Sequence, residues 1–147
     1  MLRAVNLIMR ALLHTPFAGH ARTQFMVVTV NGRKTGKQYV IPLSAHRIDG
    51  ALYAMTDAAW KHNFRDGATA EVFHDGHTTT MRGELLTDRE TVADLFHRCA
   101  ESYGVQRAQR MMGLTFRNQR IPTREEFAEA IGREHLVAIR LSPRGTP

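Results

Sequence analysis

Basic and hydroxyl side chains gather on a glycine-rich stretch near the start of the chain, Asn31–Leu43 (NGRKTGKQYVIPL). Gly32 and Gly36 permit the backbone conformations that a tight turn between two strands needs. The charged groups and backbone N–H groups of such a turn can hold a phosphate or a carboxylate. The alternative is an ordinary exposed hairpin tip, because turn chemistry alone explains the glycines. The side chains that could bind an anion are Arg33, Lys34, Thr35 and Lys37.

Other residue patterns that carry chemistry are weak or missing. His74 and His77 flank an Asp75-Gly76 turn and could face each other, but no third ligand follows at metal spacing, so we expect no metal site. The chain has no phosphate-binding P-loop, no dinucleotide fingerprint and no G-x-S-x-G elbow. Its single cysteine, Cys99, lies on an apolar helical stripe, which predicts a buried core residue.

The composition sets the broad class of the protein. A length of 147 residues predicts one domain, 1–147, and the net charge of +6 favours an anionic partner. The basic residues are scattered over turns and a late helix, so we expect no nucleic-acid partner. No apolar run is long enough to span a membrane, and one cysteine fits a reducing compartment. These features predict a cytoplasmic protein.

A series of short strands with alternating or fully apolar patterns occupies residues 25–86, and we expect it to form the core of a barrel. Asp49-Gly50 and Asp75-Gly76 are strong hairpin signals between strands. Pro42 lacks an N–H, so its strand should be an edge, carry a bulge or leave a gap in its ladder. The predicted strands are Phe25–Val30, Lys37–Ile48, Ala51–Thr56, Ala68–His74 and His77–Leu86, with Asp57–Gly67 irregular.

The period changes to helical after the strands. Asp88 is a candidate N-cap for a helix over 88–103, and a basic helical piece should follow over 105–117. Thr123 and Glu126 form a capping box that opens a helix reaching about Ile131. With these helices in the region 88–133, we expect a closing strand over 135–142. The fold class predicted is α+β, mainly β: a six-stranded antiparallel barrel with flanking helices.

Residues 1–14 place apolar side chains at helical spacing, with Arg3 and Arg10 on the other side. One interpretation is a helix that caps the core of the domain. The other is a basic amphipathic anchor, which would make peripheral contact with the inner face of the membrane.

Several of these features together resemble a known family. The segment GRKTG (32–36), the strand residues Val40, Pro42 and Leu43, the Asp49-Gly50 turn, and Trp60 with Asn63 in a W-x-x-N pattern are similar to the flavin/deazaflavin oxidoreductase superfamily. Within it they resemble the deazaflavin-dependent nitroreductases of actinobacteria, over residues 25–86. The resemblance implies a split β-barrel related to pyridoxamine-phosphate oxidases, with an N-terminal helix, and binding of coenzyme F420.

The resemblance also implies which residues contact the cofactor. The turn residues Arg33, Lys34 and Thr35 would hold its phosphate or its oligoglutamate tail. The strand Tyr39–Ser44 would run beneath the deazaflavin ring, with backbone N–H groups reaching the ring edge. The implied ring-binding residues are Tyr39, Val40, Ile41, Pro42, Leu43, Ser44, Met55 and Thr56, with Trp60, His62 and Asn63 closing the pocket.

The activity implied is hydride transfer from reduced F420 to a quinone-like or nitroaromatic acceptor. No catalytic residue is assigned; His62 and Tyr103 are candidates to deliver a proton. Two departures from the family pattern are Tyr39, where nitroreductases commonly carry arginine, and the short loop Asp57–Ala59. The alternatives are an FMN-dependent oxidoreductase on the same barrel and a non-catalytic lipid- or fatty-acid-binding protein. A homodimer is compatible with any of them.

Overall fold

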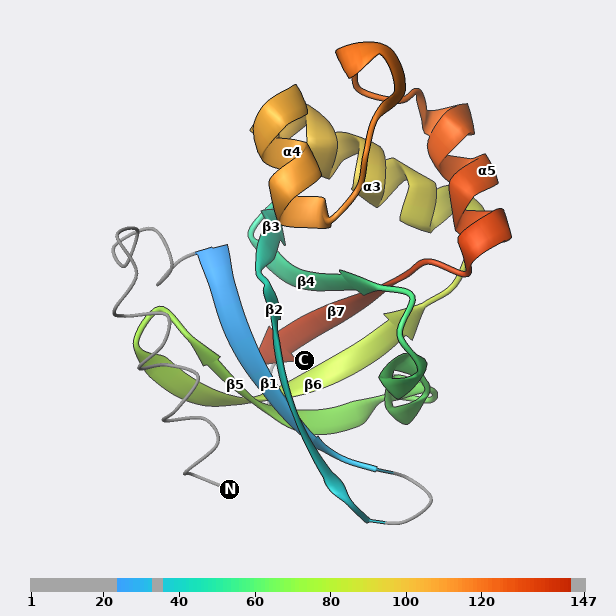
Figure 1. Cartoon of the computed structure of the whole chain (residues 1–147). Helices are drawn as coiled ribbons and strands as arrows, with labels where there is room; N and C mark the ends of the chain where they lie inside the picture. Colours follow the sequence, from blue (N-terminus) through green and yellow to red (C-terminus); the bar gives the residue numbers. More distant parts are fainter. Residues whose placement is uncertain (1–23, 33–35, 144–147) are drawn as a thin grey trace.

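The computed structural model describes residues 24–32 and 36–143, and it consists of a curled antiparallel sheet with a layer of helices on one side (Figure 1). The helices are α3 (Arg89–Tyr103), α4 (Val105–Met112) and α5 (Arg124–Glu134). Two short 3₁₀ segments, η1 (Ala59–Phe64) and η2 (Arg117–Gln119), lie in connections. The strands are β1 (Phe25–Asn31), β2 (Gln38–Ser44), β3 (His46–Ile48), β4 (Ala51–Thr56), β5 (Ala68–His74), β6 (His77–Leu86) and β7 (Val137–Pro143).

The strand order β2-β1-β5-β6-β7-β4-β3 explains how the sheet becomes a half-barrel. β2 and β3 lie at opposite edges of the sheet, yet only Ala45 separates them in the chain. Before Ala45 the chain pairs with β1, and after it the chain pairs with β4. The single strand predicted over Lys37–Ile48 is therefore two strands, and the sheet has seven strands instead of six.

Both Asp-Gly turns are tight two-residue connections, as predicted. Asp49 and Gly50 have φ of 50° and 80°, and Asp75 and Gly76 have φ of 52° and 81°. Two successive positive φ values are the signature of the type I′ turn, whose twist matches that of the flanking strands. The hairpins β3–β4 and β5–β6 therefore have a register fixed by local chemistry.

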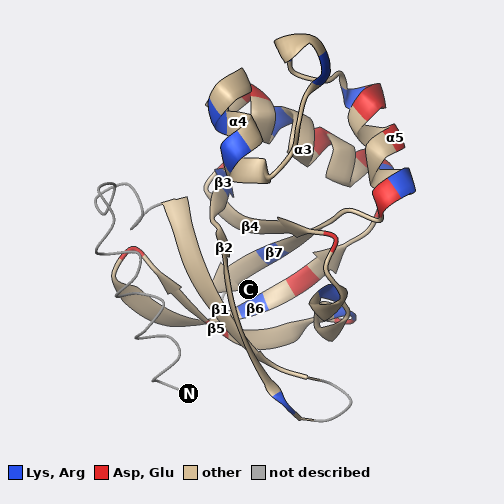
Figure 2. Cartoon of the chain, viewed as in Figure 1, with Lys and Arg blue, Asp and Glu red and all other residues tan. Residues whose placement is uncertain are grey.

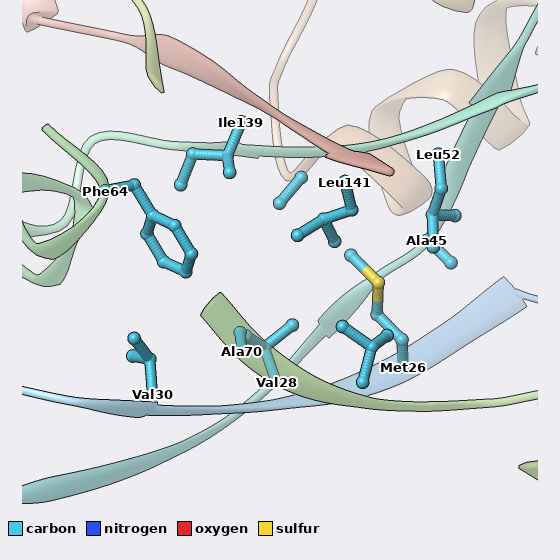
Figure 3. Packing of buried hydrophobic residues seen from close by; sticks show 11 residues of the cluster. Met26, Val28, Val30, Ala45, Leu52, Phe64, Ala70, Ile139 and Leu141 are labelled. Atoms are coloured by element: carbon cyan, nitrogen blue, oxygen red, sulfur yellow. The ribbon is translucent and has the colours of Figure 1, made fainter. Parts of the chain in front are cut away.

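The core of the barrel is built from alternate residues of its strands (Figure 3). Met26, Val28 and Val30 of β1 point inward, where side chains from β5 and β7 meet them. Phe64, which comes from η1, also enters this cluster and is fully buried. The period-2 pattern of the strands thus produces one apolar interior that an irregular segment closes.

The helix layer confirms the predicted caps and corrects two boundaries. Asp88 accepts a hydrogen bond from the Thr91 N–H at the start of α3, and Thr123 forms the capping box of α5. The helix predicted over 105–117 stops at Met112, because Gly113 adopts a left-handed conformation at its C-terminus. The last strand begins at Val137 instead of at 135, because His135 is the left-handed C-cap of α5, with φ of 57°.

No helix within residues 24–32 and 36–143 is long and apolar enough to cross a membrane. The predicted amphipathic helix over 1–14 lies outside the described residues, as do Arg33, Lys34 and Thr35 of the basic turn.

Candidate functional site

β2 has one edge that no described strand covers, and its backbone polar groups can be assigned to one edge or the other. Ala45 N–H donates to the Gln24 carbonyl (2.8 Å) and Gly32 N–H donates to the Lys37 carbonyl (2.6 Å). Hydrogen-bonded and non-hydrogen-bonded pairs alternate in an antiparallel ladder, so the odd-numbered residues of β2 bond to β1. The even-numbered residues therefore present their N–H and C=O groups at the free edge.

Three of these even-numbered residues are Val40, Pro42 and Ser44. Val40 and Ser44 each supply an N–H at the free edge, while Pro42 between them has none. The proline fits here because the ladder with β1 does not use its position. Of the three alternatives predicted for this strand, the described sheet has the edge position.

The free edge of β2 lies on a split between two strands. β3 pairs with residues 51–53 of β4, whereas β2 forms no ladder with β4 in the described part of the chain. From β3 the two strands diverge (Figure 1), so residues 54–56 of β4 also have an edge without a neighbouring strand. The backbone polar groups on these free edges can form hydrogen bonds with a ligand.

η1 closes the interior of the barrel beyond the end of β4. The Phe64 side chain is fully buried, and a Cβ at Gly83 of β6 would overlap its ring. Trp60 packs edge-on against Phe64, with ring centroids 6.2 Å apart and planes at 76°, and it remains partly exposed. The barrel plug is thus Phe64, and Trp60 keeps an accessible surface.

The polar residues of η1 hold the segment in place. Asn63 donates from its side-chain amide to the Trp60 carbonyl (3.1 Å), which gives the W-x-x-N pattern a local structural role. Lys61 is buried, and its Nζ donates to the carbonyl of His135 at the end of α5 (2.8 Å). His62 is exposed, and its Nδ1 lies 3.1 Å from Arg65 Nη2.

The structure brings together some of the predicted ring-binding residues and separates others. Ile41, Leu43 and Trp60 all pack against the barrel cluster. Met55 instead packs its side chain among the helix-side clusters, and the Thr56 hydroxyl accepts a hydrogen bond from the Ala58 N–H (2.9 Å). For these two residues, only the backbone is placed along the split.

Tyr39 marks the outer end of β2. It is exposed, at 36%, and the Lys37 ammonium lies 5.9 Å from its ring centroid. Both are odd-numbered, so they share the face of the strand on which Ile41 and Leu43 pack. An aromatic surface and a cation therefore stand next to the predicted anion-binding turn.

A buried polar cluster lies away from the split, between β3 and α3. His46 Nδ1 is 2.9 Å from the Tyr103 hydroxyl and 3.4 Å from Cys99 Sγ. Burial lowers the pKa of His46 to about 4, raises the pKa of Cys99 to about 11 and raises the pKa of Tyr103. All three groups are held neutral, and the predicted burial of Cys99 is confirmed.

His74 and His77 are direct partners across the β5–β6 hairpin, as their spacing suggested. Among the described residues, no group of three or more His, Cys, Asp or Glu side chains could hold a metal ion.

Solved structures share this fold. One is a crystal structure of the conserved hypothetical protein Rv2991 from Mycobacterium tuberculosis, which is 13% identical with a TM-score of 0.50, over 95% of this chain and 79% of that one. Another, described as a domain-swapped dimer, is also 13% identical, with a TM-score of 0.51 over 96% and 98%. No family model and no curated protein matches the chain. At such identities the likeness shows the fold alone.

Sequence reasoning missed Phe64, Lys61 and His46, the residues that determine how the site is supported. Gly83 inside β6 was the available signal for Phe64, because a glycine within a strand often marks the close approach of another group. Lys61 and His46 carry no local signal, since their partners lie 74 and 57 residues away.

Proposed function

We propose that this protein is a split-barrel reductase of the flavin/deazaflavin superfamily that binds coenzyme F420 in the split between β2 and β4. The observation that carries the proposal is the free edge of β2, where the N–H groups of Val40 and Ser44 flank the donorless Pro42. Such an edge can donate to the carbonyl and nitrogen edge of a planar ring, whose orientation it would fix.

The residues present fit the chemistry of that cofactor. Its tail is anionic, and the turn before β2 carries Arg33, Lys34 and Lys37. Trp60 offers a partly exposed aromatic surface for one wall. The bound, reduced deazaflavin supplies a hydride from its central ring, so the protein needs to position and shield the reactants. The acceptor class we propose is quinone-like or nitroaromatic.

His62 and Tyr103, the two candidates to deliver a proton, lie in different surroundings. The Tyr103 hydroxyl is within hydrogen-bond distance of His46 in a buried cluster, which gives it a structural role. His62 is exposed on η1, one residue from Lys61 and two from Trp60, and its ring is next to Arg65. We therefore assign any protein-derived proton to His62 in preference to Tyr103.

FMN on the same barrel is the second candidate. It has a single phosphate, whereas the two adjacent cations Arg33 and Lys34 suit a longer anionic tail. Lipid binding has less support. The adjacent methionines Met111 and Met112 would suit an apolar ligand, but Met111 is buried and Met112 packs within the helix-side clusters. A homodimer remains part of the proposal, since one structure with this fold is described as a domain-swapped dimer.

Titration of the purified protein with oxidised F420 and with FMN, side by side, tests the cofactor. Trp60 is the sole tryptophan, and we expect F420 to quench its emission in a saturable way and at lower concentration than FMN. If fatty acid shifts this emission and neither cofactor does, the reductase proposal is wrong.

Two variants locate the binding site. Val40→Pro removes a free-edge N–H but no ladder bond to β1, so we expect a folded protein with at least about 10-fold weaker F420 binding. Arg33→Ala combined with Lys34→Ala should weaken binding by about 100-fold or more. Circular dichroism verifies that each variant folds. Unchanged affinity in both would remove the split and the turn from the site.

A further inference from the structure

A cavity lies in the helix layer, apart from the split of the barrel. It has a volume of about 460 Å³ and is lined by the connection between α4 and α5 and by one face of α5. Figure 1 shows this connection arching between the two helices. The volume is within the range of small-molecule sites, which is about 300–1,000 Å³.

The arch is held by specific contacts. The Phe116 N–H donates to the Gln109 side chain (2.8 Å), and Arg120 makes two hydrogen bonds to the Glu126 carboxylate (2.8 and 3.1 Å). Asn118 and Gln119 both adopt left-handed conformations, with φ of 57° and 54°. Asparagine tolerates this conformation well, whereas glutamine adopts it at an energetic cost that the contacts around the arch must offset.

The floor of the cavity is apolar. Phe116 and Phe127 are buried and meet edge-to-face, with centroids 6.1 Å apart. Leu114 and Leu136 are partly buried and pack against the same cluster. An aliphatic chain or a single aromatic ring could bury its surface against these four side chains.

The charges at the rim distinguish one arginine from the others. Arg120 is paired with Glu126, and Arg133 lies 4.0 Å from Glu134. Glu129 is also at the rim, four residues before Arg133 on the same helix, where opposite charges attract. The Arg117 side chain, by contrast, forms no hydrogen bond or ion pair with the described residues, and it lines the cavity from an exposed position on the arch. In Figure 2 the ribbon of α5 carries both acidic (red) and basic (blue) residues.

We propose that this cavity binds a small amphipathic monocarboxylate, with its apolar part on the phenylalanine floor and its carboxylate on Arg117. The planar guanidinium of arginine matches a carboxylate with two parallel hydrogen bonds. The site is independent of the proposed cofactor site.

Calorimetric titration of the full chain tests this proposal with two carboxylates, decanoate and 1-naphthoate, which separate a fatty-acid ligand from an aromatic one. Decanol and decylamine serve as uncharged and cationic controls. We expect saturable binding of at least one carboxylate, at least about 10-fold tighter than the alcohol. Equal binding of decylamine, or no binding of either acid, would overturn the proposal.

Three variants place the binding. Arg117→Gln should weaken carboxylate binding by about 10-fold or more, while Arg110→Gln, on exposed α4 surface outside the cavity lining, should leave it unchanged. Ala130→Leu fills the cavity from α5 with a good helix former and should abolish binding. Thermal unfolding confirms the fold of each variant. If Arg117→Gln and Arg110→Gln behave alike, or if F420 competes with the acid, the assignment is wrong.

Discussion

The two halves of β4 differ at the edge that faces away from β7. Its first half (residues 51–53, the closed half) pairs with β3, whereas its second half (residues 54–56, the open half) has no neighbouring strand at that edge in the described chain. Beside its first half, Tyr53 pairs with His46 in the ladder, and the His46 ring lies within hydrogen-bond distance of Tyr103 and Cys99 under α3. Beside its second half, at Met55, no strand of the described chain covers the edge, and the N–H groups of Val40 and Ser44 on the free edge of β2 have no strand partner there either. The first half is a closed structural support, whereas the second half leaves donors that a ligand can use.

This contrast shows that a reactive-looking constellation can be structural while plain backbone forms the candidate site. A thiol, an imidazole and a phenol within hydrogen-bond distance resemble a catalytic group, yet burial holds all three neutral, with the pKa of Cys99 near 11. A thiol acts as a nucleophile only as its thiolate. The free edge of β2 has no unusual side chain at Val40 or Ser44, but its donors remain available.

The largest effect on stability should come from removing the Phe64 plug, which closes the barrel beyond the open half of β4. Phe64→Ala leaves a cavity at a fully buried position, so we expect a loss of about 3–5 kcal/mol in the free energy of unfolding. Urea denaturation measures it, with exposed His62→Ala as the control, which should stay within about 0.5 kcal/mol. If Phe64→Ala lowers the free energy of unfolding by less than about 1 kcal/mol, η1 does not close the barrel.

Burial of His46 beside the closed half of β4 should make the stability of the protein depend on pH. The pKa of His46 is about 4 in the folded protein and 6.5 for the free side chain, so the unfolded chain binds the proton more tightly. The contribution of neutral His46 to the free energy of unfolding is therefore fully present above its unfolded pKa of 6.5. This contribution falls by about 3 kcal/mol as the pH drops to 4. His46→Gln should remove this part of the pH dependence, whereas exposed His77→Gln should keep it. Identical curves for all three proteins would contradict the burial of a neutral imidazole.

Local chemistry explains what the sequence predicted well. The Asp-Gly turns, the capping box of Thr123 and Glu126 and the three strands β4, β5 and β6 depend on residues next to one another, and the structure confirms them. The division of one predicted strand at Ala45 depends instead on a change of partner from β1 to β4. A tertiary event of this kind leaves no mark in the period of the sequence.

The candidate site was predictable to the same limited extent. The strand Tyr39–Ser44 and Trp60 were assigned to the site through a resemblance, and in the structure Ile41, Leu43 and Trp60 pack against the barrel cluster, while their role in binding stays a prediction. The resemblance also implied Met55 and Thr56, but alternation sends the Met55 side chain to the helix layer. The basic turn lies outside the described residues, so Arg33, Lys34 and Thr35 stay a prediction.

A medium effect should follow from cutting the link between η1 and the helix layer. Lys61→Met keeps the length of the side chain but removes the donor to the His135 carbonyl, and we expect a loss of about 1.5–3 kcal/mol. Arg89→Met is the matched control, because Arg89 also donates to a carbonyl, that of Ala128, but on exposed surface. Its loss should stay near about 0.5 kcal/mol. Equal losses in chemical denaturation would show that the burial of Lys61 adds nothing.

The smallest effect on stability, and the one that most sharpens the contrast, should come from Trp60. Trp60→Leu keeps an apolar side chain against the barrel but removes the edge-to-face pair with Phe64, which is worth about 0.5–1.5 kcal/mol. Because Phe64 is the plug, the variant should still fold, as far-UV circular dichroism during urea denaturation can measure. The affinity for F420, measured from the absorbance or emission of the cofactor, should also decrease, since one aromatic wall of the pocket is missing. If Trp60→Leu unfolds the protein, Trp60 belongs to the plug. If the variant folds and binds F420 as tightly as the wild type does, the open half of β4 is not the cofactor site.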